Sequence, residues 1–177
     1  MLISTTLKTQ INNSLKKKII LLALLLIAFS LDFIRDYIFV NINYQIHYLN
    51  YLDFNYTDSF IEKFISNYSI NELSNIKWIL SFFFILMFAA ISFLLIHYKY
   101  KKQQKKFQLL TTAFFVFILT FIGISYFTSI TLTDLSLQNS FYNISIELSH
   151  YLQSSLSFIS LFMIFELYQR FNTLPTQ

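Results

Sequence analysis

Four apolar segments separated by polar stretches dominate the pattern along this 177-residue chain. They run from about Ile19 to Val40, Trp78 to Tyr98, Phe107 to Ile130 and Leu148 to Tyr168. A helix needs about 20 apolar residues to cross a hydrocarbon core of roughly 30 Å, and each segment has about that length. The pattern therefore predicts an all-α, polytopic membrane protein. Its four transmembrane helices would form one membrane domain over residues 1–177.

The stretch 41–77, between the first two apolar segments, contains two helix-start signals. Ser59 and Glu62 have the spacing of a capping box, and so have Ser69 and Glu72. After the first signal, apolar residues share one helical face: Phe60, Ile61, Phe64, Ile65 and Tyr68. We expect a short external amphipathic helix here, on the outer membrane surface or against the bundle. The second signal predicts that the next transmembrane helix begins before its apolar segment.

Lysines cluster at only one set of segment ends. Lys16–Lys18 precede the first segment, and a loop at 99–106 carries five more: Lys99, Lys101, Lys102, Lys105 and Lys106. By the positive-inside rule the N-terminal stretch and the 99–106 loop are cytoplasmic. With four spans, this predicts a protein of the bacterial cytoplasmic (inner) membrane whose two termini both lie inside. These flanking lysines explain the net charge of +4, so no nucleic-acid partner is predicted. The loop either only fixes the topology or also contacts anionic lipid headgroups.

The first segment has a second interpretation. A basic start, an apolar core and the small residues of Ala28–Phe29–Ser30 also resemble a secretory signal peptide. Apolar and aromatic residues continue through Phe33 and Phe39, as in an uncleaved helix.

Helix-breaking residues are scarce. Gly123 is the only glycine and Pro175, the only proline, lies beyond the fourth segment. Carriers with broken helices use glycine or proline within their spans. We therefore predict unbroken transmembrane helices.

Charged residues interrupt the first segment near its outer end. Asp32, Arg35 and Asp36 share one helical face, and at their depth an unpaired charge costs on the order of 1–3 kcal/mol. Residues at matching depth in the fourth segment are Glu147, His150 and Gln153. The six form a predicted polar cluster, either a structural lock between the two helices or a site for a substrate, an ion or a lipid headgroup. Four further residues either line its mouth or serve as caps and solvated loop residues: Asn41, Asn43, Gln45 and His47.

Catalytic and metal-binding patterns are weak. The chain has no cysteine, and no nucleophile, phosphate-loop or dinucleotide motif occurs. His97 and His150 are expected on opposite faces, which disfavours paired haem ligation. A metal site from His47, Glu147 and His150 is a weak alternative. No cofactor and no metal are therefore predicted.

These observations favour a non-catalytic accessory, assembly or partner-binding protein. Its predicted partners are the lipid bilayer and either a membrane protein or a second copy of the chain. The alternative is a membrane-embedded enzyme or a carrier of ions or lipids that uses the polar cluster near the outer face.

The stretch Phe33-Ile34-Arg35-Asp36-Tyr37-Ile38-Phe39-Val40-Asn41-Ile42-Asn43-Tyr44-Gln45 resembles a family of uncharacterised four-span bacterial membrane proteins, as does the step Gln153-Ser154. The layout is more distantly similar to the exosortase F-associated membrane proteins. Their Phe-Tyr-Asp-Pro element is absent, since Phe39-Val40-Asn41-Ile42 stands near its place. The resemblance implies class and compartment but no activity.

Overall fold

The fold is entirely helical in the part of the chain that the structure, a computed structural model, describes. This part is the backbone of residues 2–52 and 54–173, with side chains from residue 15 to 171 except 53 and 102. The helices are α1 (Leu2–Tyr51), α2 (Ser59–Ile65), α3 (Ile70–Lys99), the 3-10 turn η1 (Lys101–Gln103), α4 (Gln104–Thr131), α5 (Leu135–Leu152) and α6 (Ser155–Thr173). The predicted all-α class is confirmed.

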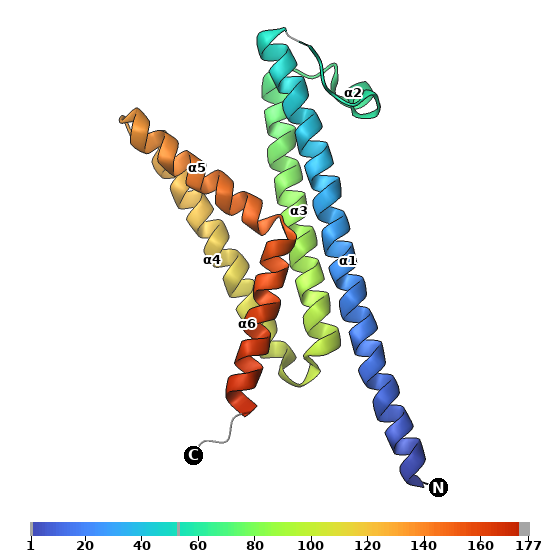
Figure 1. Ribbon diagram of the computed structural model, residues 1–177. Helices are drawn as coiled ribbons and strands as arrows, with labels where there is room; N and C mark the ends of the chain where they lie inside the picture. Colours follow the sequence, from blue (N-terminus) through green and yellow to red (C-terminus); the bar gives the residue numbers. More distant parts are fainter. Residues whose placement is uncertain (1, 53, 174–177) are drawn as a thin grey trace.

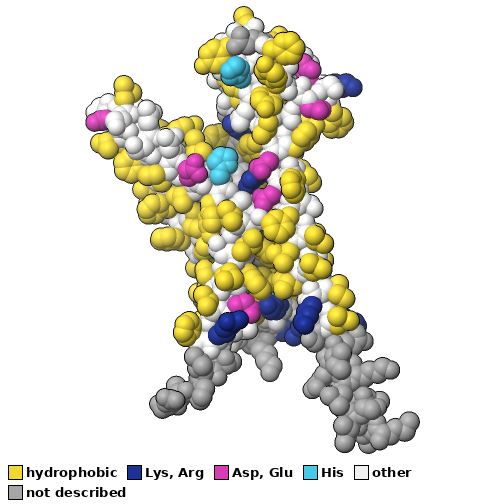
Figure 2. Space-filling model, in the orientation of Figure 1, with side chains coloured by type: hydrophobic (Ala, Val, Ile, Leu, Met, Phe, Trp, Pro, Cys, Tyr) yellow, Lys and Arg dark blue, Asp and Glu magenta, His cyan; other side chains and the backbone are white. Residues whose placement is uncertain are grey.

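Two long antiparallel helices, α1 and α3, form one arm of the molecule (Figure 1). α4 rises from η1 and leans away from them, and α5 returns beside α4. α6 then descends to the end that holds η1 and the start of α1. We call this the lysine-rich end, since the basic side chains gather there (Figure 2), and the opposite one the α2 end.

Two of the described helices, α3 and α4, are long and apolar enough to cross a membrane, and α5 with α6 makes a third if the pair counts as one span. Large apolar side chains cover the outside of the molecule, as a lipid-facing surface requires (Figure 2). The chain is therefore a membrane protein. α1 is not among these helices, because its uninterrupted apolar run ends where Asp32, Arg35 and Asp36 begin.

The prediction of unbroken helices is wrong for the fourth segment. α5 ends at Leu152 and α6 begins at Ser155, with a bend of 69° between them. Serine hydroxyls at the break bond main-chain oxygens: Ser154 Oγ donates to Tyr151 O at 2.8 Å, and Ser157 Oγ donates to Leu152 O at 3.2 Å. Such bonds offer the backbone an alternative to the helical pattern, so no glycine or proline is needed.

The two predicted helix starts have different outcomes. Ser69 and Glu72 form a complete capping box at the start of α3, as expected. α2 is also present, but Asp58 and not Ser59 caps it, accepting from the Phe60 N–H at 2.8 Å. The stretch expected to be external begins as helix, because α1 continues to Tyr51.

Candidate functional site

Two charged side chains of α1 occupy the break between α5 and α6. The Asp32 carboxylate accepts hydrogen bonds from the Ser155 N–H at 3.2 and 3.0 Å. Arg35 Nη1 donates to the main-chain oxygens of Gln153 at 2.6 Å and His150 at 3.5 Å. The end of one helix leaves carbonyls without helical partners, and the start of the next leaves N–H groups. α1 therefore supplies groups of complementary charge to both ends of the break: the Arg35 guanidinium at the carbonyls that end α5, and the Asp32 carboxylate at the N–H that begins α6.

The same arginine is paired with two carboxylates. Its Nε and Nη2 atoms donate to Asp36 Oδ1 at 3.0 and 2.7 Å, and its Nη1 lies 3.5 Å from Asp32 Oδ1. The Arg35 side chain is 12% exposed, whereas that of Asp36 is 63% exposed. Because protein groups engage all three nitrogens of the guanidinium, this arrangement supports the structural lock over a site in which Arg35 holds a ligand.

The predicted cluster is only partly assembled by side chains. Gln153 and His150 do meet Arg35, but through their main-chain oxygens. Within the described part of the chain, the side chains of Glu147 and His150 form no hydrogen bond or ion pair.

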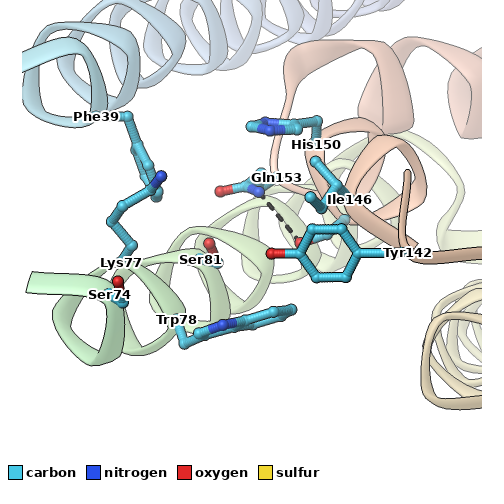
Figure 3. A pocket seen from close by; sticks show the side chains of 10 residues that line it. Phe39, Ser74, Lys77, Trp78, Ser81, Tyr142, Ile146, His150 and Gln153 are labelled. Atoms are coloured by element: carbon cyan, nitrogen blue, oxygen red, sulfur yellow. Dashed lines mark hydrogen bonds between the residues drawn. The ribbon is translucent and has the colours of Figure 1, made fainter. Parts of the chain in front are cut away.

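A cavity of about 140 Å³ lies beside the break, between α1, α3 and α5 (Figure 3). We call it the α3–α5 cavity. Its lining combines apolar and polar side chains: Phe39, Ser74, Lys77, Trp78, Ser81, Tyr142, Ile146, Ser149, His150 and Gln153. The polar groups come from two facing helices, which is the usual arrangement of a ligand site between helices.

Gln153 is the most deeply buried polar residue of this lining. It is 1% exposed, and its Nε2 donates to Ser149 Oγ at 3.2 Å. Its side-chain oxygen has no hydrogen-bond partner among the described residues and points into the space between α3 and α5 (Figure 3). A buried carbonyl without a hydrogen-bond partner costs about 1–3 kcal/mol. The binding of a ligand group that donates a hydrogen bond to this oxygen is therefore favoured.

Lys77 is the only charged residue in the lining of this cavity. Its Nζ donates to Asn43 Oδ1 at 2.7 Å, and no described carboxylate lies within ion-pair distance. The hydroxyls of Ser81 and Tyr142 also lack hydrogen-bond partners in the part of the chain described. The cavity therefore offers one cation and several donors.

The residues predicted to line a mouth have other roles. Asn41 accepts from the Asp58 N–H at 2.6 Å, and Gln45 accepts from Asn55 at 3.1 Å. Both are buried and hold the segment before α2 against α1. His47 packs on the Tyr51 ring at a centroid distance of 4.7 Å. Only Asn43 reaches the cavity, through its bond to Lys77.

The lysine-rich end is held by a small polar network. Lys99 pairs with Glu166 at 2.7 Å, and the Tyr100 hydroxyl donates to the same carboxylate. Burial and this carboxylate raise the pKa of Tyr100. Lys106 contacts the Tyr168 hydroxyl. Lys101 and Lys105 are exposed, and the side chain of Lys102 lies outside the described residues.

The described residues contain no group of three or more histidine or carboxylate side chains that could hold a metal ion. Comparisons of the chain with protein-family models, with curated proteins and with solved structures found no match.

Of the ten residues that line the cavity, the sequence-based cluster contained only His150 and Gln153. The residues that it missed include Lys77, Trp78, Ser81 and Tyr142. One signal was present, a single lysine placed directly before the only tryptophan at the start of an apolar segment. Pairing it with α5 required knowing that α5 packs beside α3.

Proposed function

We propose that the protein is a non-catalytic accessory protein of the bacterial cytoplasmic membrane that recognises a ligand or a membrane partner in the α3–α5 cavity. The observation that carries this proposal is the buried Gln153 oxygen, which is unpartnered within the described chain and points into that cavity. The cavity lies next to a helix break that Asp32 and Arg35 hold in place. A preformed pocket with a few polar groups suits the binding of a ligand.

The proposed topology has four spans, with α1 as the first and α5 with α6 as the last. Pairing of Arg35 with Asp32 and Asp36 supports this count, because paired charges lower the energy of placing α1 in the membrane. The lysine-rich end would face the cytoplasm and the α2 end the outside. Single cysteines introduced into this cysteine-free chain at Ser59 and Lys101 test this. An impermeant maleimide added to intact cells should label only the first.

Binding without turnover can be measured with a cysteine in the cavity. Ser81→Cys should react slowly with a small thiol reagent in native membranes, where an occupant protects it, and faster after delipidation and purification. Ser59→Cys, on exposed α2, should react equally in both. The purified wild type, incubated with bacterial polar lipids, should leave their composition unchanged by mass spectrometry. Equal reactivity of Ser81→Cys in both states, or a chemically altered lipid, would overturn the proposal.

The alternative, a carrier, is favoured by one observation, the break between α5 and α6. Carriers use the free backbone groups of broken helices to hold their substrates. Here those groups already bond Asp32 and Arg35. Solute uptake by proteoliposomes containing the wild type, and its loss in His150→Ala, would support the carrier.

A further inference from the structure

We infer that the α3–α5 cavity binds the headgroup of a phospholipid that combines a phosphate with a free hydroxyl, as a phosphoglycerol headgroup does. This inference rests on the proposed function, because it names the ligand class of the same cavity.

The phosphate is matched by the donors of the cavity. Lys77 carries the only charge in the lining. Among the described residues its ammonium group donates only to Asn43, which leaves two ammonium N–H groups for a ligand. The hydroxyls of Ser81 and Tyr142 have no partner in the described chain, and that of Tyr142 points across the cavity toward α3 (Figure 3). A phosphate oxygen accepts from an ammonium or a hydroxyl with a short, charge-assisted bond.

The hydroxyl is matched by the Gln153 oxygen, which can only accept. A ligand made of acceptors alone would leave this buried atom unsatisfied. An ammonium donor fits less well than a hydroxyl, because the cavity lining contains no carboxylate to balance its charge. The positive charge of Arg35, whose Nη1 lies 2.6 Å from the main-chain oxygen of the same glutamine, also disfavours a second cation at this place.

The rim of the cavity suits a lipid better than a soluble phosphate. Trp78 packs edge-on against Tyr126 at 5.7 Å, and Tyr126 lies 6.5 Å from Tyr142. Next to them on α3, Ile79 and Phe82 are 70% and 56% exposed. Aromatic residues of this kind sit at the membrane interface, where headgroups meet acyl chains. The volume of about 140 Å³ accommodates a compact polar group, while acyl chains would lie outside along the exposed apolar side chains.

The single tryptophan makes the test direct, since Trp78 lines the cavity and no other residue contributes tryptophan fluorescence. The full chain is reconstituted into protein-free liposomes of phosphatidylcholine, and the mole fraction of phosphatidylglycerol with brominated acyl chains is raised. Brominated phosphatidylcholine at equal fractions measures contact with bulk lipid. We expect brominated phosphatidylglycerol to quench Trp78 at about tenfold lower mole fraction than brominated phosphatidylcholine or phosphatidylethanolamine. Equal quenching by all three lipids would overturn the inference.

Variants with matched controls assign the effect to the cavity. Lys77→Met and Gln153→Met should each weaken the preference for phosphatidylglycerol about tenfold, the loss expected for one hydrogen bond to a charged or buried group. Lys63→Met on α2 and Gln138→Met at the far end of α5 should leave it unchanged. Should Gln153→Met fail to fold, Lys77→Met still decides, because Lys77 is only half-buried. Unchanged preference in Lys77→Met would overturn the inference.

Soluble competitors separate the two sources of phosphate. Glycerol 3-phosphate and inorganic phosphate, added at millimolar concentration, should not relieve quenching by brominated phosphatidylglycerol. Relief by either compound would show that the cavity binds a soluble phosphate and would overturn the inference of a lipid headgroup. Protection of Ser81→Cys in native membranes without any lipid preference would leave the proposed function standing and defeat this inference. A preference for phosphatidylglycerol together with its chemical turnover would support this inference and overturn the proposed non-catalytic function.

Discussion

Arg35 Nη1 lies 2.6 Å from the main-chain oxygen of Gln153, which is 118 positions later in the chain. Together with the bond from the Ser155 N–H to Asp32, it ties α1 to the point where α5 gives way to α6. The contact joins a charged side chain to a backbone group, so the identity of the residue at 153 matters less for it than the helix break does.

Replacing Arg35 with methionine should destabilise the protein strongly. The change removes the positive charge between Asp32 and Asp36 and leaves the Gln153 carbonyl without its donor. Breaking a largely buried ion pair from one side costs on the order of 3 kcal/mol. Thermal unfolding in detergent should show a clearly lower midpoint. Lys63→Met, an exposed change on α2, is the control and should leave the midpoint nearly unchanged. Equal midpoints for Arg35→Met and wild type would contradict the structural lock.

The bend between α5 and α6 should depend on Ser157. Its hydroxyl donates to the oxygens of Leu152 at 3.2 Å and Ser154 at 2.9 Å, and alanine removes both bonds. We expect Ser157→Ala to broaden the distribution of bend angles, because the break loses two of the bonds that define it. Spin labels on cysteines at Asn143 and Met163, introduced into the cysteine-free chain, allow this to be measured by pulsed electron spin resonance. Ser140→Ala, on the exposed part of α5, is the matched control. An identical distance distribution would show that the capping from α1 alone defines the bend.

Asn41 should control the order of the segment before α2. Its side chain accepts from the Asp58 N–H at 2.6 Å and donates to Tyr37 O at 2.8 Å. Asn41→Leu leaves the Asp58 N–H without this partner, at a cost of about 1–3 kcal/mol. Amide hydrogen exchange from residue 54 to residue 65 should become faster, while exchange in α4 stays the same. Asn143→Leu, at an exposed position of α5, should change neither. Unchanged exchange before α2 in the Asn41 variant would mean that Gln45 alone holds this segment.

Tyr100 should make stability depend on high pH. Burial and the nearby Glu166 carboxylate raise its pKa above the usual value of about 10. Since the folded state then holds this proton more tightly than the unfolded state, the stabilisation is complete below about pH 10 and is lost as pH rises further. Tyr100→Phe should therefore be less stable by about 1 kcal/mol at pH 8, for the lost hydrogen bond, and the difference should shrink above pH 10. Denaturant unfolding of both proteins in detergent at pH 8 and above pH 10 measures this. Tyr98→Phe, whose ring is more exposed, provides the reference. A constant difference across this range would show that Tyr100 does not titrate in the way described.

The sequence predicted the helical class and the neighbourhood of the break, because both follow from residue spacing. Counting residues along two helices put Asp32 and Arg35 level with His150 and Gln153, and the structure brings these four together. The pattern also predicted the capping box of Ser69, since a cap depends only on residues within one turn.

The break itself could not be predicted in the same way. A run of serines is compatible with a continuous helix, and the bend is stabilised by capping groups more than a hundred positions away. The cavity was missed for a similar reason. Lys77 and Tyr142 line the same cavity only because α5 runs back toward α3 and meets it near the break. In each case the missing information is tertiary packing, which a local pattern does not contain.

The capping of the break by α1 has a consequence for biogenesis. α1 is synthesised first, but the backbone groups that bond Asp32 and Arg35 emerge from the ribosome more than a hundred residues later. In the four-span topology proposed above, α1 would enter the membrane while its charged face has only its own acidic neighbours. A nascent chain that stops before residue 153 would keep this face exposed to membrane proteases. The charges of Asp32 and Arg35 thus find their backbone partners only when synthesis has passed the break between α5 and α6.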